Sequence, residues 1–270
     1  MSECFRYIFL KNEKAKPAKD FNDKIFLQGI SLYEVIRVVS GKALFLESHF
    51  QRLTNSAAYL EQSLWLNLNE IKASISNLIA LNDSQNGNIK LVFHIEGENK
   101  TFLAYFIQHY YPTENQYRNG VRTLVHQADR PKPNAKVYNH SLRSATNDLI
   151  KEAEIFEVLL LNSMGNITEG SRSNLFFIKN DELHTALDTD VLHGIIRSKV
   201  IEAAEELKIP VRKHSIKYDD LPSFQAAFLT GTSILILPIK RINSISYSSS
   251  HKIIGKLSEV LRTKISEYLK

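Results

Sequence analysis

One lysine and one carboxylate have the residue types that covalent carbonyl chemistry needs. Lys136 lies in a short polar and aromatic stretch, residues 134–140, just before an expected helix. A lysine amine attacks a carbonyl only after it loses its proton, which burial or cationic neighbours make easier. Most lysines are solvated surface groups. Lys136 by itself therefore predicts nothing.

The carboxylate is Glu169, in the segment 168–174 between two apolar strands. A carboxylate held here could pair with a protonated ring nitrogen and keep a heterocyclic cofactor an effective electron sink. A polar surface hairpin beside Gly165 would explain the same residues. The segment alone leaves both interpretations open.

Two turns further along have the features of anion sites. At residues 192–197 an amphipathic helix begins after Gly194, so the amides of Ile195 and Ile196 would face outward at the positive end of the helix dipole. Residues 230–233 follow an apolar strand, with Gly231 allowing close approach to a phosphate and Thr232 offering a hydroxyl. Ordinary helix entry also explains the first turn. Together with the lysine and the carboxylate, the two turns indicate a phosphate-bearing cofactor site.

The elements that must position these residues fall into two groups, separated by a linker-like polar stretch at 112–120. Strands and helices are mixed without strict alternation, which predicts an α+β fold with a small N-terminal α/β domain, 1–115, and a larger C-terminal α/β domain, 116–270. Periodicity predicts strands at 6–12, 89–95, 101–108, 121–126, 158–161, 174–178 and 228–232, a hairpin over 32–45 turning at Ser40 and Gly41, and helices at 47–64, 69–80, 141–153, 194–207 and 253–269.

Composition narrows the class of protein. A chain of 270 residues with 43% hydrophobic residues can bury a full core. The net charge of +5 comes from basic residues spread among acidic ones, so we expect anionic small molecules rather than nucleic acid as partners. No apolar stretch approaches the roughly 20 residues that span a bilayer, and a soluble cytoplasmic protein is expected. Cys4, the single cysteine, predicts neither a disulfide framework nor a thiol nucleophile.

The order and spacing of these features resemble one family, the class IV aminotransferases, which includes branched-chain and D-amino-acid aminotransferases and aminodeoxychorismate lyase. Asn139 comes three residues after Lys136, as in that family. Glu169 comes 33 residues after Lys136 (169 − 136) in a Thr-Glu-Gly segment, which also resembles that family. Residues 194–197 and 230–232 resemble its helix start and its phosphate turn. Residues 33–37 resemble its Tyr-Glu-Val-Ile strand and residues 49–53 its His-x-x-Arg-Leu helix. The resemblance covers almost the whole chain.

The resemblance implies a fold with pyridoxal 5'-phosphate between the two domains, and it implies residue roles. Lys136 would carry the cofactor as a Schiff base and move the substrate α proton, and Glu169 would bind the pyridine nitrogen. The remaining expected contacts are to the phosphate, from Arg52, the amides of Ile195 and Ile196, Gly231 and Thr232, and to the substrate, from Tyr33, His94 and His140. No metal is expected.

Two departures concern the substrate. Members that act on free α-amino acids commonly have an arginine on the strand at 92–96, and this chain has none there, although His94 could partly replace it. The lyase has a threonine pair where this chain has Glu34 and Val35. The resemblance therefore implies amino-group transfer between an amino acid and a 2-keto acid as the first expectation. The alternatives are aminodeoxychorismate cleavage to 4-aminobenzoate and pyruvate, and a non-catalytic binding protein on the same fold. A homodimer is implied by resemblance alone.

Overall fold

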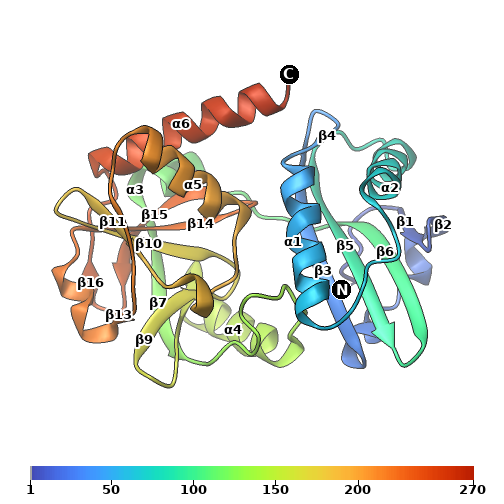
Figure 1. Ribbon diagram of the computed structural model, residues 1–270, viewed down its shortest axis with the longest axis horizontal. Coiled ribbons are helices and arrows are strands. Elements are labelled where there is room, and N and C mark those ends of the chain that lie inside the picture. The colour runs from blue at the N-terminus through green and yellow to red at the C-terminus, as the bar shows by residue number, and fades with distance from the viewer. Residues whose placement is uncertain (1) are drawn as a thin grey trace. The chain divides into compact units, whose positions relative to one another are not determined.

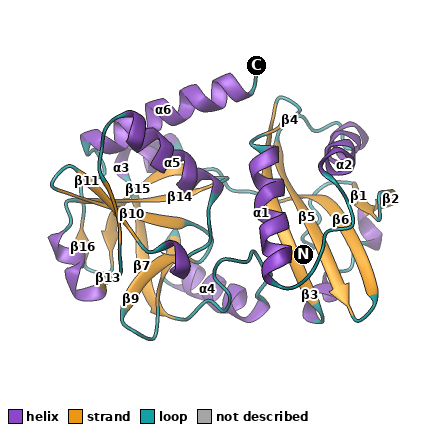
Figure 2. Ribbon diagram, in the orientation of Figure 1, coloured by secondary structure: helices purple, strands orange, loops and turns teal. Residues whose placement is uncertain are grey.

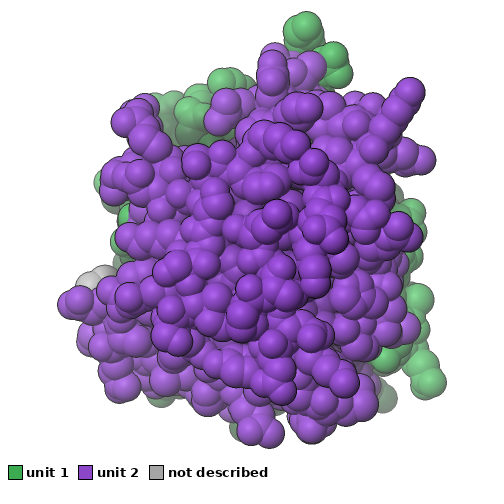
Figure 3. Space-filling view, turned by 90° about the vertical axis from the view of Figure 1, so that its left-hand side faces the viewer, with its two compact units in different colours: residues 1–110, 135–140, 267–270 green, residues 111–134, 141–266 purple. Residues whose placement is uncertain are grey.

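The computed structural model describes residues 2–270, which form two compact units (Figure 3). Unit 1 contains the chain up to Tyr110 together with Ala135–His140 and Glu267–Lys270, and unit 2 contains Tyr111–Asn134 and Ser141–Ser266. The expected division at residue 115 placed Lys136 in the larger domain. The structure places it in unit 1, because Lys136 and its neighbours hydrogen-bond to a strand of that unit, β3 (Ile30–Val39).

Unit 1 is built on a six-stranded antiparallel sheet in the order β2-β1-β6-β5-β3-β4 (Figure 1). The turn between β3 and β4 follows the prediction, since Ser40 and Gly41 have φ angles of 49° and 76°, as a tight hairpin turn with two left-handed residues requires. The other strands are β1 (Ile8–Lys11), β2 (Lys14–Pro17), β4 (Lys42–Ala43), β5 (Gly87–Glu96) and β6 (Asn99–Ile107).

Two helices, α1 (Leu46–Tyr59) and α2 (Leu68–Leu81), supply apolar side chains to a core on one face of this sheet. Each fully buried Leu or Ile there contributes roughly 1.5–3 kcal/mol. Helix α1 ends earlier than the predicted residue 64 because Glu61 has a left-handed φ of 58°. Leu64 kept the helical spacing because it still packs on the same core from the loop that follows.

The opposite face of the sheet has its own apolar cluster, which includes Phe9, Tyr33, Val92 and Tyr105. Successive side chains of a strand point to opposite faces. On β5, Leu91 and Phe93 therefore join the helix-side core, whereas Val92 joins this second cluster.

Unit 2 is built on a larger mixed sheet in the order β12-β11-β10-β14-β15-β7-β8-β9-β13, with β16 paired to β15 (Figure 2). Its strands are β7 (Val121–Gln127), β8 (Glu157–Leu161), β9 (Asn166–Gly170), β10 (Asn174–Lys179), β11 (Glu182–Thr185), β12 (Val211–Lys213), β13 (Ile216–Lys217), β14 (Ala226–Gly231), β15 (Leu235–Ile242) and β16 (Ile245–Ser246). Its helices are α3 (Glu114–Asn119), α4 (His140–Glu152), α5 (Ile195–Glu206) and α6 (Lys252–Tyr268), of which α4 and α6 each extend into the residues of unit 1. Each unit has its own sheet together with helices, which confirms the predicted α+β fold.

The predicted linker at 112–120 is mostly helical. Thr113 and Gln116 form a reciprocal capping box that begins α3, and such a box satisfies two backbone amides that a short helix would otherwise leave open. Among residues 2–270, no helix has the length and apolar character needed to cross a membrane.

Candidate active site

Lys136 is held beside β3 by its main chain. The Tyr33 amide donates to the Lys136 carbonyl at 3.1 Å, the Lys136 amide donates to Ser56 Oγ at 3.1 Å, and Val137 forms a bridge with Leu32. The Lys136 side chain is half-buried, with Nζ 4.7 Å from the centroid of the Tyr33 ring. Its position is therefore set by a strand and a helix far away in the sequence.

Arg52 faces a buried carboxylate from the neighbouring strand. Its Nε and Nη2 donate to Glu34 at 2.8 and 2.6 Å, and His49 Nδ1 lies 2.7 Å from Glu34 Oε2. Burial raises the pKa of Glu34, but the charge and hydrogen bonds of Arg52 and His49 outweigh it and lower the pKa to about 2. The pKa of His49 is lowered, mainly by burial. The hydrogen bond and charge of Glu34 oppose this shift, whereas the charges of Arg52 and Lys136 add to it.

This pairing gives Arg52 a structural role that the sequence did not show. A guanidinium has five N–H donors, so two bonds to Glu34 do not exclude the predicted phosphate contact, which stays a prediction. The pairing also accounts for both oxygens of Glu34, which contact Arg52 and His49 of α1 on the helix side of the sheet.

The three expected substrate residues have different surroundings. Tyr33 is buried beside Lys136, as described above. His94 is buried on β5, and its Nδ1 lies 2.9 Å from Ser31 Oγ. His140 is exposed at the first residue of α4. Only Tyr33 of the three has a contact with the Lys136 side chain among those described.

Glu169 is buried in unit 2, and other groups of that unit fix both of its oxygens. Arg130 Nε lies 2.6 Å from Glu169 Oε1 in an ion pair. Oε2 accepts hydrogen bonds from Asn174 Nδ2 at 3.1 Å and from the Leu192 amide at 3.0 Å. The orientation of the carboxylate is therefore set by three separate segments of unit 2.

The loop after Glu169 is held by a second buried carboxylate, Glu157. Glu157 accepts from Ser171 Oγ at 2.7 Å, from Ser173 Oγ at 2.9 Å and from the Arg172 amide at 3.2 Å. A Cβ at Gly170 would collide with Ser173 Oγ, so a larger residue at this position would force the Ser173 side chain to move. The polar segment is thus an ordered, inward-facing loop rather than a surface hairpin.

Asn174 connects this carboxylate to the start of α5. Its Nδ2 donates to Glu169 and also to the Leu192 carbonyl at 2.8 Å, and a Cβ at Gly194 would collide with Asn174 Oδ1. Gly194 caps the helix without a side-chain hydrogen bond, and the first backbone bond back to it comes from Ser198 at 2.9 Å. The amides of Ile195 and Ile196 precede that bond and lie at the positive end of the helix.

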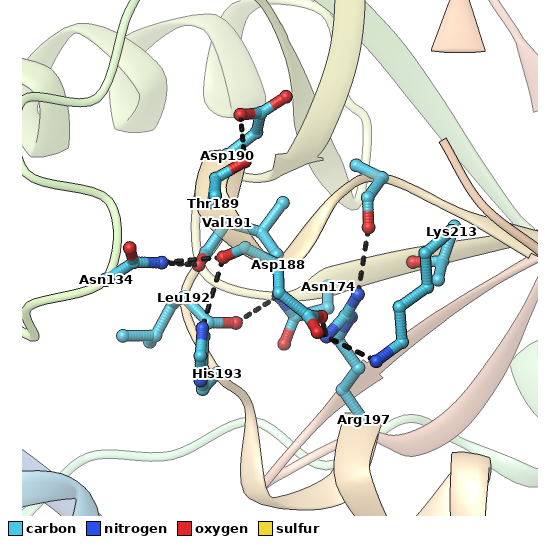
Figure 4. A network of polar contacts seen from close by, with 12 residues as sticks. Asn134, Asn174, Asp188, Thr189, Asp190, Val191, Leu192, His193, Arg197 and Lys213 are labelled. Atoms are coloured by element: carbon cyan, nitrogen blue, oxygen red, sulfur yellow. Dashed lines mark hydrogen bonds and ion pairs between the residues drawn. The ribbon is translucent and has the colours of Figure 1, made fainter. Parts of the chain in front are cut away.

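The loop before α5 is ordered by Asp188 (Figure 4). Arg197 Nη1 donates to Asp188 Oδ1 at 2.7 Å and Lys213 Nζ to Oδ2 at 2.8 Å. Burial raises the pKa of Asp188, but the bonds from Lys213 and Arg197 outweigh it and lower the pKa. Asn134 Nδ2 donates to the carbonyls of Asp188 and Val191 at 2.7 and 2.9 Å. The loop that leads to Gly194 is therefore fixed at both ends.

The second predicted anion turn lies next to Asn174. Thr230 pairs with Asn174 in the register of β10 and β14, and Gly231 and Thr232 follow at half-buried positions. Thr230 Oγ1 is buried and has no hydrogen-bond partner among residues 2–270. Buried hydroxyls are nearly always hydrogen-bonded, so this hydroxyl is available to bind a ligand oxygen.

Several of these residues were missed by sequence reasoning. Glu157 and Arg130 carry no local motif, and Ser56 is one of many serines on a helix. The chain did offer one signal, since Asn174 belongs to the same segment as Glu169.

Cys4 is buried, and burial raises the pKa of its thiol to about 11. A thiol with so high a pKa is a poor nucleophile, in agreement with the expectation from the sequence.

Comparison with known proteins places this geometry in a family. Residues 31–242 match the family described as amino-transferase class IV. The chain is 27% identical over 265 residues to a D-alanine aminotransferase of Bacillus licheniformis, covering 94% of this chain and 92% of that protein. It is 25% identical over 244 residues to an aminodeoxychorismate lyase of Bacillus subtilis (strain 168), covering 84% and 82%.

A solved structure shows the same fold. A T.th. branched-chain amino acid aminotransferase, complexed with N-(5'-phosphopyridoxyl)-L-glutamate, superposes with a TM-score of 0.85 at 21% identity, covering 98% of this chain and 96% of that one. The two-sheet fold and the ordered polar segments therefore define a class IV aminotransferase-like enzyme. The chain belongs to the class IV aminotransferase family, whose members use pyridoxal phosphate.

Proposed function

We propose that this protein transfers an amino group between an amino acid and a 2-keto acid, with pyridoxal 5'-phosphate bound covalently through Lys136. The observation that carries the proposal is the linkage of Glu169, Asn174 and Gly194. Hydrogen bonds and close packing join the carboxylate for the ring nitrogen to the helix start for the phosphate. Such a linkage suits one rigid ligand that has both groups.

Several groups of the chain suit this cofactor. Glu169 would accept the ring N–H, and the amides of Ile195 and Ile196 and the turn at Gly231 and Thr232 would bind the phosphate. Arg52 would add a charge to the phosphate while Glu34 fixes its guanidinium. The branched-chain enzyme with the same fold was solved with a phosphopyridoxyl compound, which supports this choice of cofactor.

The chain's own residues then divide the work. When bound, pyridoxal phosphate supplies an electron sink for negative charge at the substrate α carbon. Lys136 would hold the cofactor as a Schiff base through Nζ, and the same Nζ would move the substrate α proton as a general base and acid. The Tyr33 ring limits where Nζ can move. Arg130 and Glu169 keep a negative oxygen in place for the ring nitrogen.

Amino-group transfer is favoured over lyase chemistry by the position of Glu34. The threonine pair of the lyase would lie at Glu34 and Val35. Here Glu34 is buried and bound to Arg52 and His49, and Val35 has no hydroxyl. The 25% identity to the Bacillus subtilis lyase keeps aminodeoxychorismate cleavage as the second candidate.

The test begins with the cofactor. Purified protein incubated with pyridoxal phosphate should gain visible absorbance that borohydride treatment abolishes and that Lys136→Ala lacks. A protein that stays colourless and retains no cofactor contradicts the proposal and leaves a binding protein on this fold.

The second step separates the reactions. We expect keto-acid formation when D- or L-amino acids are combined with 2-oxoglutarate. Pyruvate release from aminodeoxychorismate without amino exchange would instead identify a lyase. The homodimer and the cytoplasmic location expected from the sequence stay predictions, and the first is checked by light scattering of the loaded protein.

A further inference from the structure

Helix α1 begins without a cap from its own sequence. Its N-cap residue, Phe45, is left-handed, with φ 54° and ψ 40°, and offers no side-chain hydrogen bond. The amides of a helix's first turn have no acceptor within the helix, and a Ser, Thr, Asp or Asn usually supplies one. The first backbone bond of α1 runs from the His49 amide to the Phe45 carbonyl at 3.1 Å. The amides ahead of His49 therefore depend on acceptors outside the helix backbone.

Tyr268, the last residue of α6, provides such an acceptor from 222 residues further along the chain than Leu46. Its hydroxyl accepts from the Leu46 amide at 3.0 Å and donates to Glu47 Oε2 at 2.5 Å, and its ring packs edge-on against Phe45 with centroids 5.0 Å apart. All four residues belong to unit 1. Burial and the Glu47 carboxylate raise the pKa of Tyr268 to about 12, so the hydroxyl keeps the proton that it donates. Tyr268 is thus a cap for α1 that comes from a distant segment.

Helix α1 carries three side chains that hold parts of the candidate site. His49 and Arg52 both contact Glu34, and Ser56 Oγ accepts from the Lys136 amide. Because these positions are three and four residues apart, their side chains lie along one face of the helix. The placement of α1 therefore affects both the guanidinium expected at the phosphate and the main chain of the expected Schiff-base lysine.

The path from the cap to Arg52 is short. The capped amide of Leu46 and the first backbone bond, from His49, lie in the same first turn. The buried ring of His49 in turn contacts Glu34 Oε2 at 2.7 Å. Opening of this turn would take His49 away from Glu34, so the pair of Glu34 and Arg52 would lose the contact that fixes it from the start of the helix.

An ordinary helix cap would contribute to stability only. Loss of a cap lowers the stability of most helices, and the packing of Tyr268 on Phe45 would stabilise the fold by itself. The hydroxyl adds two directed contacts at the turn that carries His49. The stabilising role and a positioning role therefore predict different results when the hydroxyl alone is removed.

We propose that Tyr268 is a positioning residue for the cofactor site, because its hydroxyl caps α1 and thereby fixes the arrangement of His49, Glu34 and Arg52 that receives the phosphate. The inference rests on the proposed function, which assigns the phosphate to Arg52. Tyr268 acts through the helix and needs no contact with the cofactor. It lies beyond residues 31–242, the stretch that matches the family, so the family match does not assign it a role.

Removal of the hydroxyl alone tests the proposal. Tyr268→Phe keeps the ring on Phe45 and leaves the neighbouring contact of Lys42 Nζ with the Leu269 carbonyl at 2.5 Å. We expect pyridoxal phosphate, measured by absorbance titration, to bind about three- to tenfold more weakly to this variant. Pyridoxal, which lacks the phosphate, should bind equally well to the variant and to the unaltered protein. Unchanged affinity for pyridoxal phosphate, or an equal loss for both compounds, overturns the proposal.

Tyr247→Phe is the matched control in unit 2. The Tyr247 hydroxyl donates to the Leu221 carbonyl at 2.9 Å, so this variant also loses a tyrosine hydrogen bond, and both variants should lower Tm by a few degrees. Only Tyr268→Phe should lose affinity for pyridoxal phosphate. The same loss in both variants would show a general effect of stability and would count against positioning.

Gly255→Ala separates stability from positioning within α6. A Cβ at Gly255 meets nothing within 4 Å, and alanine is favoured over glycine inside a helix. The double variant of Gly255→Ala and Tyr268→Phe should therefore regain Tm but not affinity for pyridoxal phosphate. Recovery of both would mean that Tyr268 only stabilises the fold.

A measurement without cofactor distinguishes failure of this inference from failure of the proposed function. Nitrogen-15 NMR of the His49 ring should show a changed Nδ1 signal in Tyr268→Phe and an unchanged one in Tyr247→Phe. If that change occurs but the protein never retains pyridoxal phosphate, the proposed function fails and the coupling of Tyr268 to His49 stands. If the protein binds cofactor and exchanges amino groups, but neither the His49 signal nor the affinity depends on Tyr268, this inference alone is overturned.

Discussion

Arg130 Nε lies 2.6 Å from Glu169 Oε1, and Arg130 Nη2 also donates to the Ser171 carbonyl at 2.9 Å. One guanidinium thus connects the carboxylate expected at the cofactor ring with the loop that follows it. A fixed positive charge favours the ionised carboxylate, which is the form that can accept a ring N–H. Arg130 is therefore a positioning residue for Glu169.

Substitution of Arg130 should weaken cofactor retention. Arg130→Gln removes the charge and one loop contact, and we expect pyridoxal phosphate to bind roughly ten- to a hundredfold more weakly, the usual value of a hydrogen bond to a charged group. Absorbance titration measures the affinity, and Arg130→Lys should recover part of it. Unchanged affinity in Arg130→Gln, with unchanged cofactor absorbance across pH, would contradict this role.

Gly194 gives a sharper test of the helix-start site. Gly194→Ala places a methyl group against Asn174 Oδ1, so either Asn174 or the helix start must move. We expect weaker binding of pyridoxal phosphate, by about tenfold or more, and of inorganic phosphate.

Gly255 is the matched control for that variant. A Cβ there meets nothing within 4 Å in α6, so Gly255→Ala should raise stability slightly, by about 0.5–1 kcal/mol, and leave cofactor affinity unchanged. If the two glycine variants bind cofactor equally well, Gly194 has no part in the anion site.

Thr230 separates ligand binding from stability. Its Oγ1 has no partner among residues 2–270, so Thr230→Val should not destabilise the cofactor-free protein but should weaken phosphate and cofactor binding. Thr185 is equally buried, and its Oγ1 donates to the Leu175 carbonyl at 2.8 Å. Thr185→Val should therefore cost about 1 kcal/mol or more of stability and leave binding alone. Chemical denaturation and calorimetry of both variants check the contrast.

The lowered pKa of Glu34 predicts how the stability of the folded chain changes with pH in the acid range. Its pKa falls from 4.5 to about 2 in the folded chain, so folding is favoured by the ionised form above pH 4.5 and loses that benefit as the pH falls from 4.5 towards 2. The benefit is on the order of 3 kcal/mol. The lowered pKa of His49 acts in the same sense below its ordinary value of 6.5.

Denaturant unfolding at a series of pH values measures this dependence. Glu34→Gln should be less stable at neutral pH, because it leaves Arg52 buried beside a neutral partner, and its stability should fall less steeply with acid. An equally steep acid loss in Glu34→Gln would show that other groups cause it.

Several elements of the fold follow from the sequence because their signals are local. The hairpin at Ser40 and Gly41 needs two left-handed residues in succession, and the start of α5 needs a glycine before an amphipathic repeat. Spacing along the chain also identified Lys136 and Glu169 as a pair worth testing. Such signals fail where packing decides, as at the end of α1, where Leu64 keeps helical spacing outside the helix.

The sequence by itself determined which residues are available and where many of the strands and helices lie, because these depend on side-chain type and on neighbours within a few positions. Only the tertiary structure decided what each residue meets. Lys136 lies beside Tyr33 and Ser56, Arg52 is paired with Glu34, and Lys90 holds Glu3. These partners are brought together by strand pairing and burial across long sequence separations, where no periodic pattern connects them. The lysine that could be recognised from its spacing was Lys136, whereas the buried ammonium of Lys90 became visible only in the folded chain.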